Sequence, residues 1–326
     1  MQEYITNSII AATIAVIASV LMGPIMIPFL RRLKVGQSIR EEGPKRHFAK
    51  AGTPTMGGII IITAVMLATF IMAGNNPETL AAVLLMLVYA AIGFCDDYIK
   101  VVLKRSLGLR AREKILLQVL TGLFFALMLM YFFHRGTAII IPFTSIVIDL
   151  GYLYIPFVMF VIIAAANAVN LTDGLDGLAS GVTLFVALGL LLICLMTSHY
   201  QLSIFCGALA GACIGFLFFN RYPARIFMGD TGSMALGGAI AAVAALTRSE
   251  LGLVILGGVY VIEALSVIIQ VFFYQTTGKR IFLMSPLHHH FELKGWSETR
   301  IVKVFSIASL VFVVFGLMAL KGVGIR

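Results

Sequence analysis

Ten apolar segments set the architecture of this 326-residue chain. Most are about 20 residues long, which is enough to cross the hydrocarbon core of a bilayer as an α-helix. They cover residues 5–30, 56–73, 79–95, 115–133, 152–169, 178–197, 202–219, 233–246, 251–274 and 301–320. The sequence therefore predicts an all-α, polytopic integral membrane protein with ten transmembrane helices. The eighth segment is short and rich in Gly and Ala, which favours close packing. The ninth is long and is expected to tilt or bend.

Composition supports this class. Charged residues make up 12% of the chain, against about 25% in a typical soluble protein. The opening Met-Gln-Glu-Tyr has no basic region or cleavage pattern, so we expect an uncleaved first span. We also expect a single domain over residues 1–326, because no linker, low-complexity tract or repeat interrupts the pattern.

The distribution of basic residues predicts the topology. Of 24 Lys and Arg, 20 lie in residues 31–50, 100–114, 221–225 and 279–303, all on one side of the predicted spans. The positive-inside rule makes that side cytoplasmic and places both termini outside. The net charge of +9 then reflects topology, and we expect no nucleic-acid partner. On the outer side, residues 137–141 and 145–148 flank Pro142-Phe143-Thr144, which predicts a small external β-hairpin.

Five aspartates fall at the cytoplasmic ends of the predicted spans: Asp96, Asp97, Asp173, Asp176 and Asp230. Carboxylates at membrane level are costly and are usually kept for function. The adjacent pair at 96–97 would repel unless a metal ion or a proton lay nearby. A charged helix cap paired with Lys100 is the structural alternative. If the topology is right, the cluster is an active site for a charged substrate.

Polar residues recur at every third position where the fifth span ends: Asn167, Asn170, Asp173 and Asp176. Gly174 and Gly177 follow the two aspartates and should loosen the helix end. Freed amides beside carboxylates suit a phosphate–Mg²⁺ site, whereas an Asx-rich turn is the alternative. Asp230, between Gly229 and Gly232, is either the N-cap of the eighth span or a metal ligand facing phosphates, with Asn220 and Arg225 in support.

Three further segments carry candidate site residues. The triplet at 288–290 follows Pro286, and histidines contacting phosphate oxygens are a better interpretation than zinc or solvated loop residues. Residues 50–58 are rich in Gly and hydroxyls and resemble a phosphate-approach loop, without the P-loop pattern. Glu263 and Gln270 lie seven residues apart, on one face of the ninth span.

Five motifs occur in one order along nearly the whole chain: Gly-Thr-Pro-Thr-Met-Gly-Gly at 52–58, Asp-Asp-x-x-Lys at 96–100, Asn-Leu-Thr-Asp-Gly-Leu-Asp-Gly at 170–177, Asn-x-x-Pro-Ala with Gly-Asp-Thr-Gly-Ser within 220–233, and Pro-Leu-His-His-His-Phe-Glu at 286–292. Together they resemble the polyprenyl-phosphate N-acetylhexosamine-1-phosphate transferases. The histidine triplet followed by Phe-Glu resembles the muramoyl-pentapeptide branch more than the N-acetylglucosamine branch.

The resemblance implies an Mg²⁺-dependent transfer of phospho-MurNAc-pentapeptide from UDP-MurNAc-pentapeptide to undecaprenyl phosphate, giving lipid I and UMP. It further implies a homodimer in the bacterial cytoplasmic membrane, with the active site at the cytoplasmic face. Direct attack is favoured over an aspartyl-phosphate intermediate, although the sequence leaves both routes open. The alternatives are transfer from UDP-GlcNAc, or a transporter that uses its acids for proton coupling. A transporter would need a site near the midplane, whereas the polar residues here crowd one face.

The resemblance also implies residue roles. Catalytic residues are Asp96, Asp97, Asp230, His288 and His289, with Asp230 holding the Mg²⁺ and Asp96 accepting a proton from the lipid phosphate or steering it. Substrate-binding residues are Lys50, Thr55, Lys100, Lys114, Asn170, Asp173, Gly174, Asp176, Asn220, Phe227, Gln270 and His290. Within that set, Asn170, Asp173, Gly174, Asp176 and Phe227 would form the nucleotide pocket.

Overall fold

The structure is a computed structural model that describes residues 1–32, 50, 52–105, 107–144 and 146–321. Its α-helices are α1 (Gln2–Arg32), α2 (Gly58–Ala73), α3 (Pro77–Val101), α4 (Ala111–Leu127), α5 (Tyr154–Thr172), α6 (Leu178–Met196), α7 (Tyr200–Asn220), α8 (Gly229–Leu246), α9 (Glu250–Leu256), α10 (Gly258–Thr277), α11 (Leu287–Leu293) and α12 (Glu298–Lys321). The strands β1 (Ala138–Ile140) and β2 (Val147–Asp149) lie between α4 and α5, with a π-turn, η2 (Met128–Phe132), before them and a 3-10 turn, η3 (Gly151–Leu153), after them.

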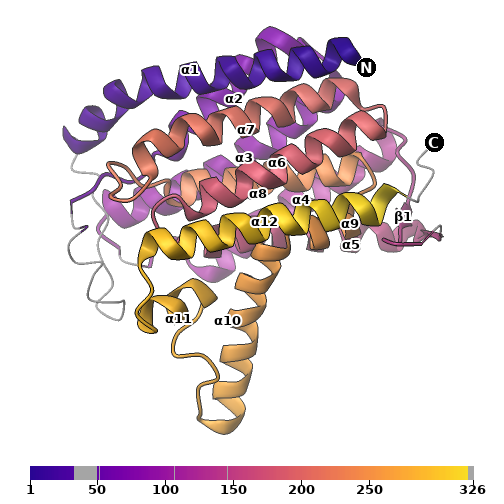
Figure 1. The fold of residues 1–326 in the computed structure, drawn as a ribbon. Coiled ribbons are helices and arrows are strands. Elements are labelled where there is room, and N and C mark those ends of the chain that lie inside the picture. The colour runs from indigo at the N-terminus through magenta and orange to yellow at the C-terminus, as the bar shows by residue number, and fades with distance from the viewer. Residues whose placement is uncertain (33–49, 51, 106, 145, 322–326) are drawn as a thin grey trace.

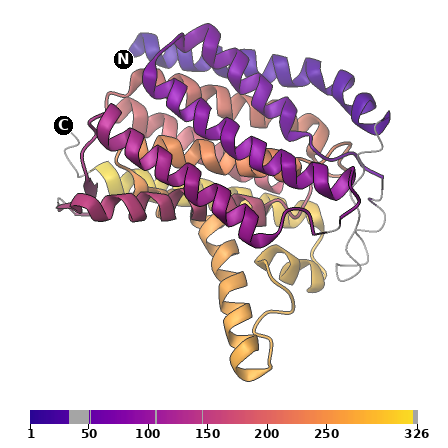
Figure 2. The ribbon, with the colours of Figure 1, turned by 180° about the vertical axis from the view of Figure 1, so that it is seen from behind.

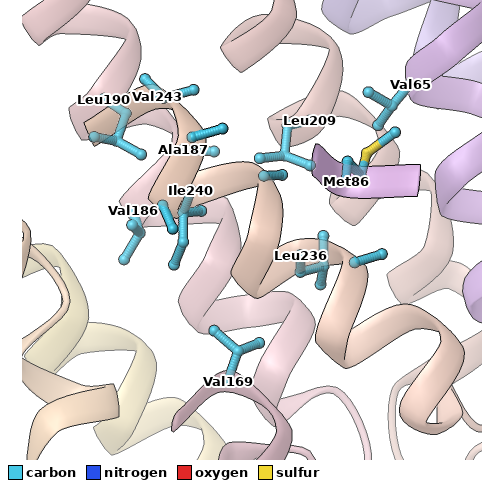
Figure 3. Packing of buried hydrophobic residues seen from close by; sticks show 14 of the residues in the cluster. Val65, Met86, Val169, Val186, Ala187, Leu190, Leu209, Leu236, Ile240 and Val243 are labelled. Carbon is cyan, nitrogen blue, oxygen red and sulfur yellow. The ribbon is translucent and has the colours of Figure 1, made fainter. Parts of the chain in front are cut away.

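The predicted spans are present. Among the described residues, nine helices are long and apolar enough to cross a membrane, and the 16-residue α2 is a shorter apolar tenth. The polytopic all-α class is thereby confirmed. Helix α8 is the centre of the bundle, because 89% of the residues in its apolar stretch are buried, compared with 22% in α1. Figure 3 shows its side chains packed among residues of five surrounding helices: Val65, Met86, Val169, Val186, Leu190 and Leu209.

Small residues bring α7 against α1. Gly207, Gly211 and Gly215 recur at every fourth position of α7, on the face that meets α1. A Cβ added to Gly207 would lie 2.4 Å from the carbonyl oxygen of Ser8, and one added to Gly211 would lie 2.1 Å from that of Ala12. Because glycine has no side chain beyond a hydrogen atom, the two helix backbones come into contact here, as is typical of helix pairs in membranes.

The ninth span is broken, as its length predicted. It divides at Gly257 into α9, which stays in the bundle, and α10, which leaves it at a steep angle and projects well beyond the other helices (Figures 1 and 2). Two consecutive glycines at 257–258 mark the break, and such pairs are a common cause of sharp kinks. Large apolar side chains are exposed along α10, Ile268 and Phe272 among them, which suits a helix surrounded by lipid.

The predicted hairpin is also present. β1 and β2 pair antiparallel, with Ala138 opposite Asp149 and Ile140 opposite Val147. The start of α1 and the end of α12 lie at the same end of the bundle as the hairpin (Figure 1). That this end faces outward remains a prediction from the basic residues.

A buried ion pair fastens the hairpin end of the bundle. The Arg135 guanidinium pairs with Glu250 at the start of α9, and its Nε donates to the carbonyl oxygen of Ala245 at 2.8 Å. The Tyr154 hydroxyl donates to the same Glu250 carboxylate at 2.8 Å. Arg135 and Glu250 are both almost fully buried, so each charge depends on the other.

Candidate functional site

The aspartates singled out in the sequence come together where α3 and α5 end and α8 begins. This is the end of α5 opposite the hairpin, because β2 precedes the start of that helix. The cluster is therefore built from segments at 96–100, 170–177 and 229–233, supplemented by residues from α4 and from the segment before α2.

Asp97 caps helix α8 from outside that helix. Its Oδ1 accepts from the backbone N–H of Asp230 at 3.1 Å, and its Oδ2 accepts from the backbone N–H and the hydroxyl of Thr231 at 2.8 and 2.7 Å. These amides belong to the first turn, which has no partners within its own helix. Gly229 precedes them with a left-handed φ of +71°, and a Cβ added to Gly93 would lie 2.1 Å from the carbonyl oxygen of Asp230. Because Asp97 supplies the cap, the Asp230 carboxylate remains available for other contacts.

The Asp230 carboxylate collects cations and an amide. Its Oδ2 accepts from Lys114 at 2.9 Å and from Lys100 at 3.1 Å, and its Oδ1 accepts from the Asn170 side chain at 2.9 Å. Lys100 also pairs with Asp96. Helices α3, α4, α5 and α8 thus each contribute to one charged cluster, to which α4 brings Lys114.

Asp96 differs from its neighbour in its contacts. One oxygen pairs with Lys100, and the other accepts from the backbone N–H of Leu109 at 2.9 Å. A Cβ added to Gly108, whose φ is +62°, would lie 2.7 Å from this carboxylate. Asp96 therefore connects the turn before α4 with the lysine that also contacts Asp230.

Asp173 lies in a turn beyond the end of α5, in agreement with the loosened helix end predicted from Gly174 and Gly177. Helix α5 ends at Thr172, so the polar stripe is not continuous, and residues 173–177 form a turn. Within the part of the chain that the structure describes, no group donates a hydrogen bond to the Asp173 carboxylate. Burial, together with the negative charges of Asp230, Asp97 and Asp176, raises its pKa well above the usual range.

The oxygen groups here fit Mg²⁺. Over the described residues, no three acidic, histidine or cysteine side chains gather as ligands of one ion. Mg²⁺ usually takes only one or two protein carboxylates and completes its shell with water and substrate phosphates. The Asp173 carboxylate has no described donor and lies beside other carboxylates, so a bound cation would reduce the repulsion between their charges.

Lys50 joins two carboxylates from distant parts of the chain. Its Nζ donates to Asp176 Oδ1 at 2.6 Å and to Glu298 Oε1 at 2.7 Å. Burial alone would lower the pKa of Lys50, but the bonds to Asp176 and Glu298 outweigh it, and the pKa is raised. A cavity of about 250 Å³ opens beside this group and is also lined by Tyr222 and Ala224.

Asn220 and residues 54–58 fix the backbone around the Lys50 cavity through hydrogen bonds. The buried Asn220 side chain accepts from the N–H of Gly177 and donates to the carbonyl of Ile226, both at 3.0 Å. The Phe227 N–H donates to the carbonyl of Pro54 at 2.8 Å, and its carbonyl accepts from Gly57 at 2.9 Å. Phe227 is thereby fixed with its ring centre 6.0 Å from the Lys50 ammonium.

Thr55 is buried in the same wall. A Cβ added to Gly229 would lie 2.8 Å from the Thr55 hydroxyl oxygen and 2.5 Å from Asp97 Oδ2. The hydroxyl is therefore adjacent to the cap of α8.

The three histidines have different surroundings. His288 is fully buried, with its Nδ1 3.2 Å from Glu263 Oε2 and its Nε2 edge against Gly174, where an added Cβ would lie only 2.1 Å away. The Nδ1 atom of His289 lies 2.7 Å from a carboxylate oxygen of Glu292. The triplet thus brings α11 onto the turn that holds Asp173 and onto α10.

His290 and Gln270 both bind backbone. His290 Nδ1 accepts from the N–H of Leu283 at 3.1 Å, and burial and Lys294 lower its pKa. The Gln270 Oε1 accepts from the N–H groups of Ile281 and Phe282 at 3.0 Å. Both side chains hold the segment that returns from the tip of α10.

Two residues of the site were not predicted from sequence. Glu298 had no place in the predicted set, and Glu263 was noted only for its position on the ninth span. A usable signal for Glu298 was a carboxylate at the start of an apolar span, on the side that the basic residues predict to be cytoplasmic, which is the same signal that marked Asp230.

The fold and this site define a class of multi-pass membrane transferases, and comparison with known proteins gives the same class. The family model for Glycosyl transferase family 4 matches residues 79–248, a range that contains all five clustered aspartates. A second pattern, Phospho-N-acetylmuramoyl-pentapeptide-transferase signature 1, matches residues 50–62, where Lys50 and Thr55 lie.

Whole-chain relatives narrow the class. The chain is 54% identical to the phospho-N-acetylmuramoyl-pentapeptide-transferase of Desulfitobacterium hafniense over 324 residues, covering 95% of this chain and 96% of that protein. It is 53% identical to the protein of that name from Bacillus subtilis, with coverage of 92% and 93%, and 50% identical to that of Desulforudis audaxviator, with coverage of 97% and 99%. The chain belongs to the phospho-N-acetylmuramoyl-pentapeptide-transferase family. The resemblance seen in the sequence motifs is confirmed.

Proposed function

We propose that this protein transfers phospho-MurNAc-pentapeptide from UDP-MurNAc-pentapeptide to undecaprenyl phosphate, releasing UMP and forming lipid I for peptidoglycan synthesis. The observation that carries the proposal is the Asp230 cluster, in which Lys100, Lys114 and Asn170 surround one carboxylate at the start of α8. Such a cluster offers both the cations and the metal-binding oxygen that phosphoryl transfer requires.

The chemistry is an exchange of phosphate esters. An oxygen of the lipid phosphate forms a bond to the phosphorus that carries MurNAc, and the bond from that phosphorus to UMP breaks. A phosphate monoester has a second pKa of about 6, so the attacking group is mostly dianionic at neutral pH and needs little help from a base. In this proposal Asp96 accepts the remaining proton or steers the lipid phosphate, and attack is direct.

The lysines counter the charge that builds up. Lys100 and Lys114 both lie within hydrogen-bond distance of Asp230, so both ammonium groups are beside the proposed reaction centre. Their positions are fixed by helices α3 and α4, which limits reorganisation when phosphates arrive. Asp97 serves the reaction by holding the start of α8, and with it Asp230, in place.

Mg²⁺ is the proposed cofactor, held by Asp230 with Asp173 nearby. When bound, the ion would neutralise the pyrophosphate and the UMP leaving group. The donor-free carboxylate of Asp173 supports this proposal, since it lies among other negative charges.

The nucleotide would occupy the region between the 173–177 turn and Phe227. We assign the uracil to the Phe227 ring, and the phosphates and sugar to Lys50, His288 and His289. The ring and the Lys50 ammonium, 6.0 Å apart, offer stacking and charge at one place. The isoprenoid tail would lie along α10, whose apolar side chains are exposed outside the bundle. The site would face the cytoplasm of a bacterium, in a homodimer.

Purified protein in detergent tests the proposal. With undecaprenyl phosphate and Mg²⁺, we expect UMP release from UDP-MurNAc-pentapeptide and its abolition by EDTA. Release from UDP-GlcNAc alone would move the enzyme to the sister branch. If neither nucleotide released UMP from folded protein, the transferase proposal would fail and a transporter would have to be considered.

One substitution tests the central residue. Asp230→Ala should lower kcat by about 100-fold or more, because the carboxylate proposed to hold the Mg²⁺ and to place the Lys100 and Lys114 ammonium groups is lost. Asp149→Ala, which removes an exposed aspartate in β2 at the opposite end, is the matched control and should keep wild-type rates. Full transfer by Asp230→Ala would remove Asp230 from the chemistry.

A further inference from the structure

We propose that Glu298, the first residue of α12, is a positioning residue that fixes Asp176 and Lys50 for the nucleotide. The inference rests on the proposed function, because it concerns the same pocket. It adds a residue from the last helix to a site that the sequence motifs had placed between residues 50 and 292.

The contacts of Glu298 go to the pocket. Its Oε1 accepts from the backbone N–H of Asp176 at 2.6 Å and from Lys50 Nζ at 2.7 Å. The Glu298 side chain is 10% exposed and that of Asp176 is 2% exposed, so water competes poorly for either. Charge-assisted bonds in such surroundings are among the stronger hydrogen bonds in proteins.

Asp176 is held from three directions, and Glu298 supplies one of them. Asp176 Oδ1 accepts from Lys50, and its Oδ2 accepts from the N–H of Ala224 at 2.9 Å. The Asp176 N–H is the third point, and Glu298 is its acceptor. Without that acceptor the N–H would be buried and unbonded, and the turn at 173–177 would lose a fixed point next to Asp173 and Gly174.

Lys50 is held in the same way. Two carboxylates fix its ammonium, which lies 5.9 Å from the ring centre of Tyr222 and 6.0 Å from that of Phe227. Removing Glu298 leaves Asp176 as the one described carboxylate that binds it. The ammonium would then move between Asp176 and the cavity, and the nucleotide would have to order it on binding.

A simpler role for Glu298 is favourable charge at a helix start. Glutamates in the first turn interact well with the helix dipole, and that role would predict a small loss of stability only. The observed bonds instead lead to residues 122 and 248 positions away in the chain. If Glu298 positions Asp176 and Lys50 for binding of the nucleotide, its removal should change KM for the UDP substrate and leave kcat and the KM for lipid phosphate nearly unchanged.

Two variants separate the roles. Glu298→Ala removes both bonds and should raise the KM for UDP-MurNAc-pentapeptide by about tenfold, the effect of one buried charge-assisted bond. Glu298→Gln keeps an oxygen that can accept from the Asp176 N–H and from Lys50, so it should stay within about threefold of wild type. Glu3→Gln, at a first-turn glutamate of α1 at the hairpin end, is the matched control and should match wild type.

Hydrogen exchange gives a readout that does not need turnover. Exchange at the Asp176 amide should rise in Glu298→Ala and stay low in Glu298→Gln. An unchanged KM and unchanged exchange in Glu298→Ala, in protein that transfers normally, would overturn the inference and leave the proposed function intact. Equal losses of kcat and lipid affinity would overturn it in favour of a general structural role. A wild-type protein that transfers neither UDP-sugar would instead overturn the function, and exchange would still test whether Glu298 holds the turn.

Discussion

Neighbouring residues in this site have separate roles. Asp96 and Asp97 are adjacent in α3, yet both Asp97 oxygens bind the first turn of α8, whereas Asp96 pairs with a lysine of the charged cluster. A carboxylate that caps a buried helix start contributes to stability, and one that shares a lysine with Asp230 contributes to the electrostatics of the site. Substitution at each position should therefore be visible in different measurements.

Asp97→Ala should lower the free energy of unfolding by about 1–2 kcal/mol, because the amides of Asp230 and Thr231 lose their acceptor. Asp96→Asn should leave the unfolding temperature closer to wild type while reducing transfer. Thermal unfolding in detergent, run on both variants, measures the difference. Equal stability in wild type and Asp97→Ala would show that Asp97 is not the cap.

His290 gives the segment at 281–283 a pH dependence. Burial and Lys294 lower its pKa below 6.5, and its Nδ1 must be unprotonated to accept from Leu283. Between the folded pKa and 6.5 the unfolded chain binds more protons, so the stabilisation is complete above about pH 6.5 and is lost as the pH falls through the folded value.

We therefore expect faster amide exchange in residues 281–283 at pH 5 than at pH 7.5, after correction for intrinsic rates. His290→Gln offers an amide oxygen as acceptor and does not titrate, so the pH effect should disappear in that variant. The same pH effect in His290→Gln would assign it to another group.

At the scale of elements, glycine spacing decides how close the helices come. Gly211→Val should separate α7 from α1, since even a Cβ at this position would lie 2.1 Å from a backbone oxygen of α1. We expect a loss of about 1–3 kcal/mol or more in unfolding free energy, the usual cost of overpacking. Gly74→Ala, at a position with open space around it but a left-handed φ, is the contrasting case and should cost less than Gly211→Val. Denaturation by increasing SDS fraction compares the two.

Most of the elements were predictable, and the contacts between them were not. Apolar length located the spans and indicated that the ninth would tilt or bend, because bilayer thickness imposes that pattern, whereas the turn residues at 142–144 located the hairpin. The motif at 170–177 was predicted to open the end of its helix, and it does so after Thr172. That Asp97 would cap a helix 133 residues away, or that Glu298 would bind Asp176, depends on how the helices cross, and one sequence carries no signal of that kind.

At the scale of the whole molecule, a buried ion pair and the charged cluster lie at opposite ends of the bundle. The buried Arg135–Glu250 pair fastens the hairpin end, and the charged cluster lies where α5 ends and α8 begins, at the other end of those helices. Residues at the hairpin end have no described contact with the aspartate cluster. Substitutions at the hairpin end should therefore lower the free energy of unfolding and leave kcat and KM of the folded molecules unchanged.

Arg135→Met should cost about 3–5 kcal/mol of unfolding free energy, because Glu250 is left as a buried charge without its partner. The double variant Arg135→Met with Glu250→Leu should recover part of that loss. In both, KM for either substrate should match wild type when rates are normalised to folded protein. A changed KM would show that the two ends are coupled.

The bond between Lys50 and Glu298 joins residues 248 positions apart. During synthesis, a ribosome must therefore deliver the last helix to the membrane before the ammonium of Lys50 has both of its partners. A transcript truncated ahead of residue 298 would yield nine inserted spans and an unfinished pocket. Such a fragment would lack the Glu298 acceptor for both Lys50 and the Asp176 N–H, so the pocket is completed only after the last helix has been made.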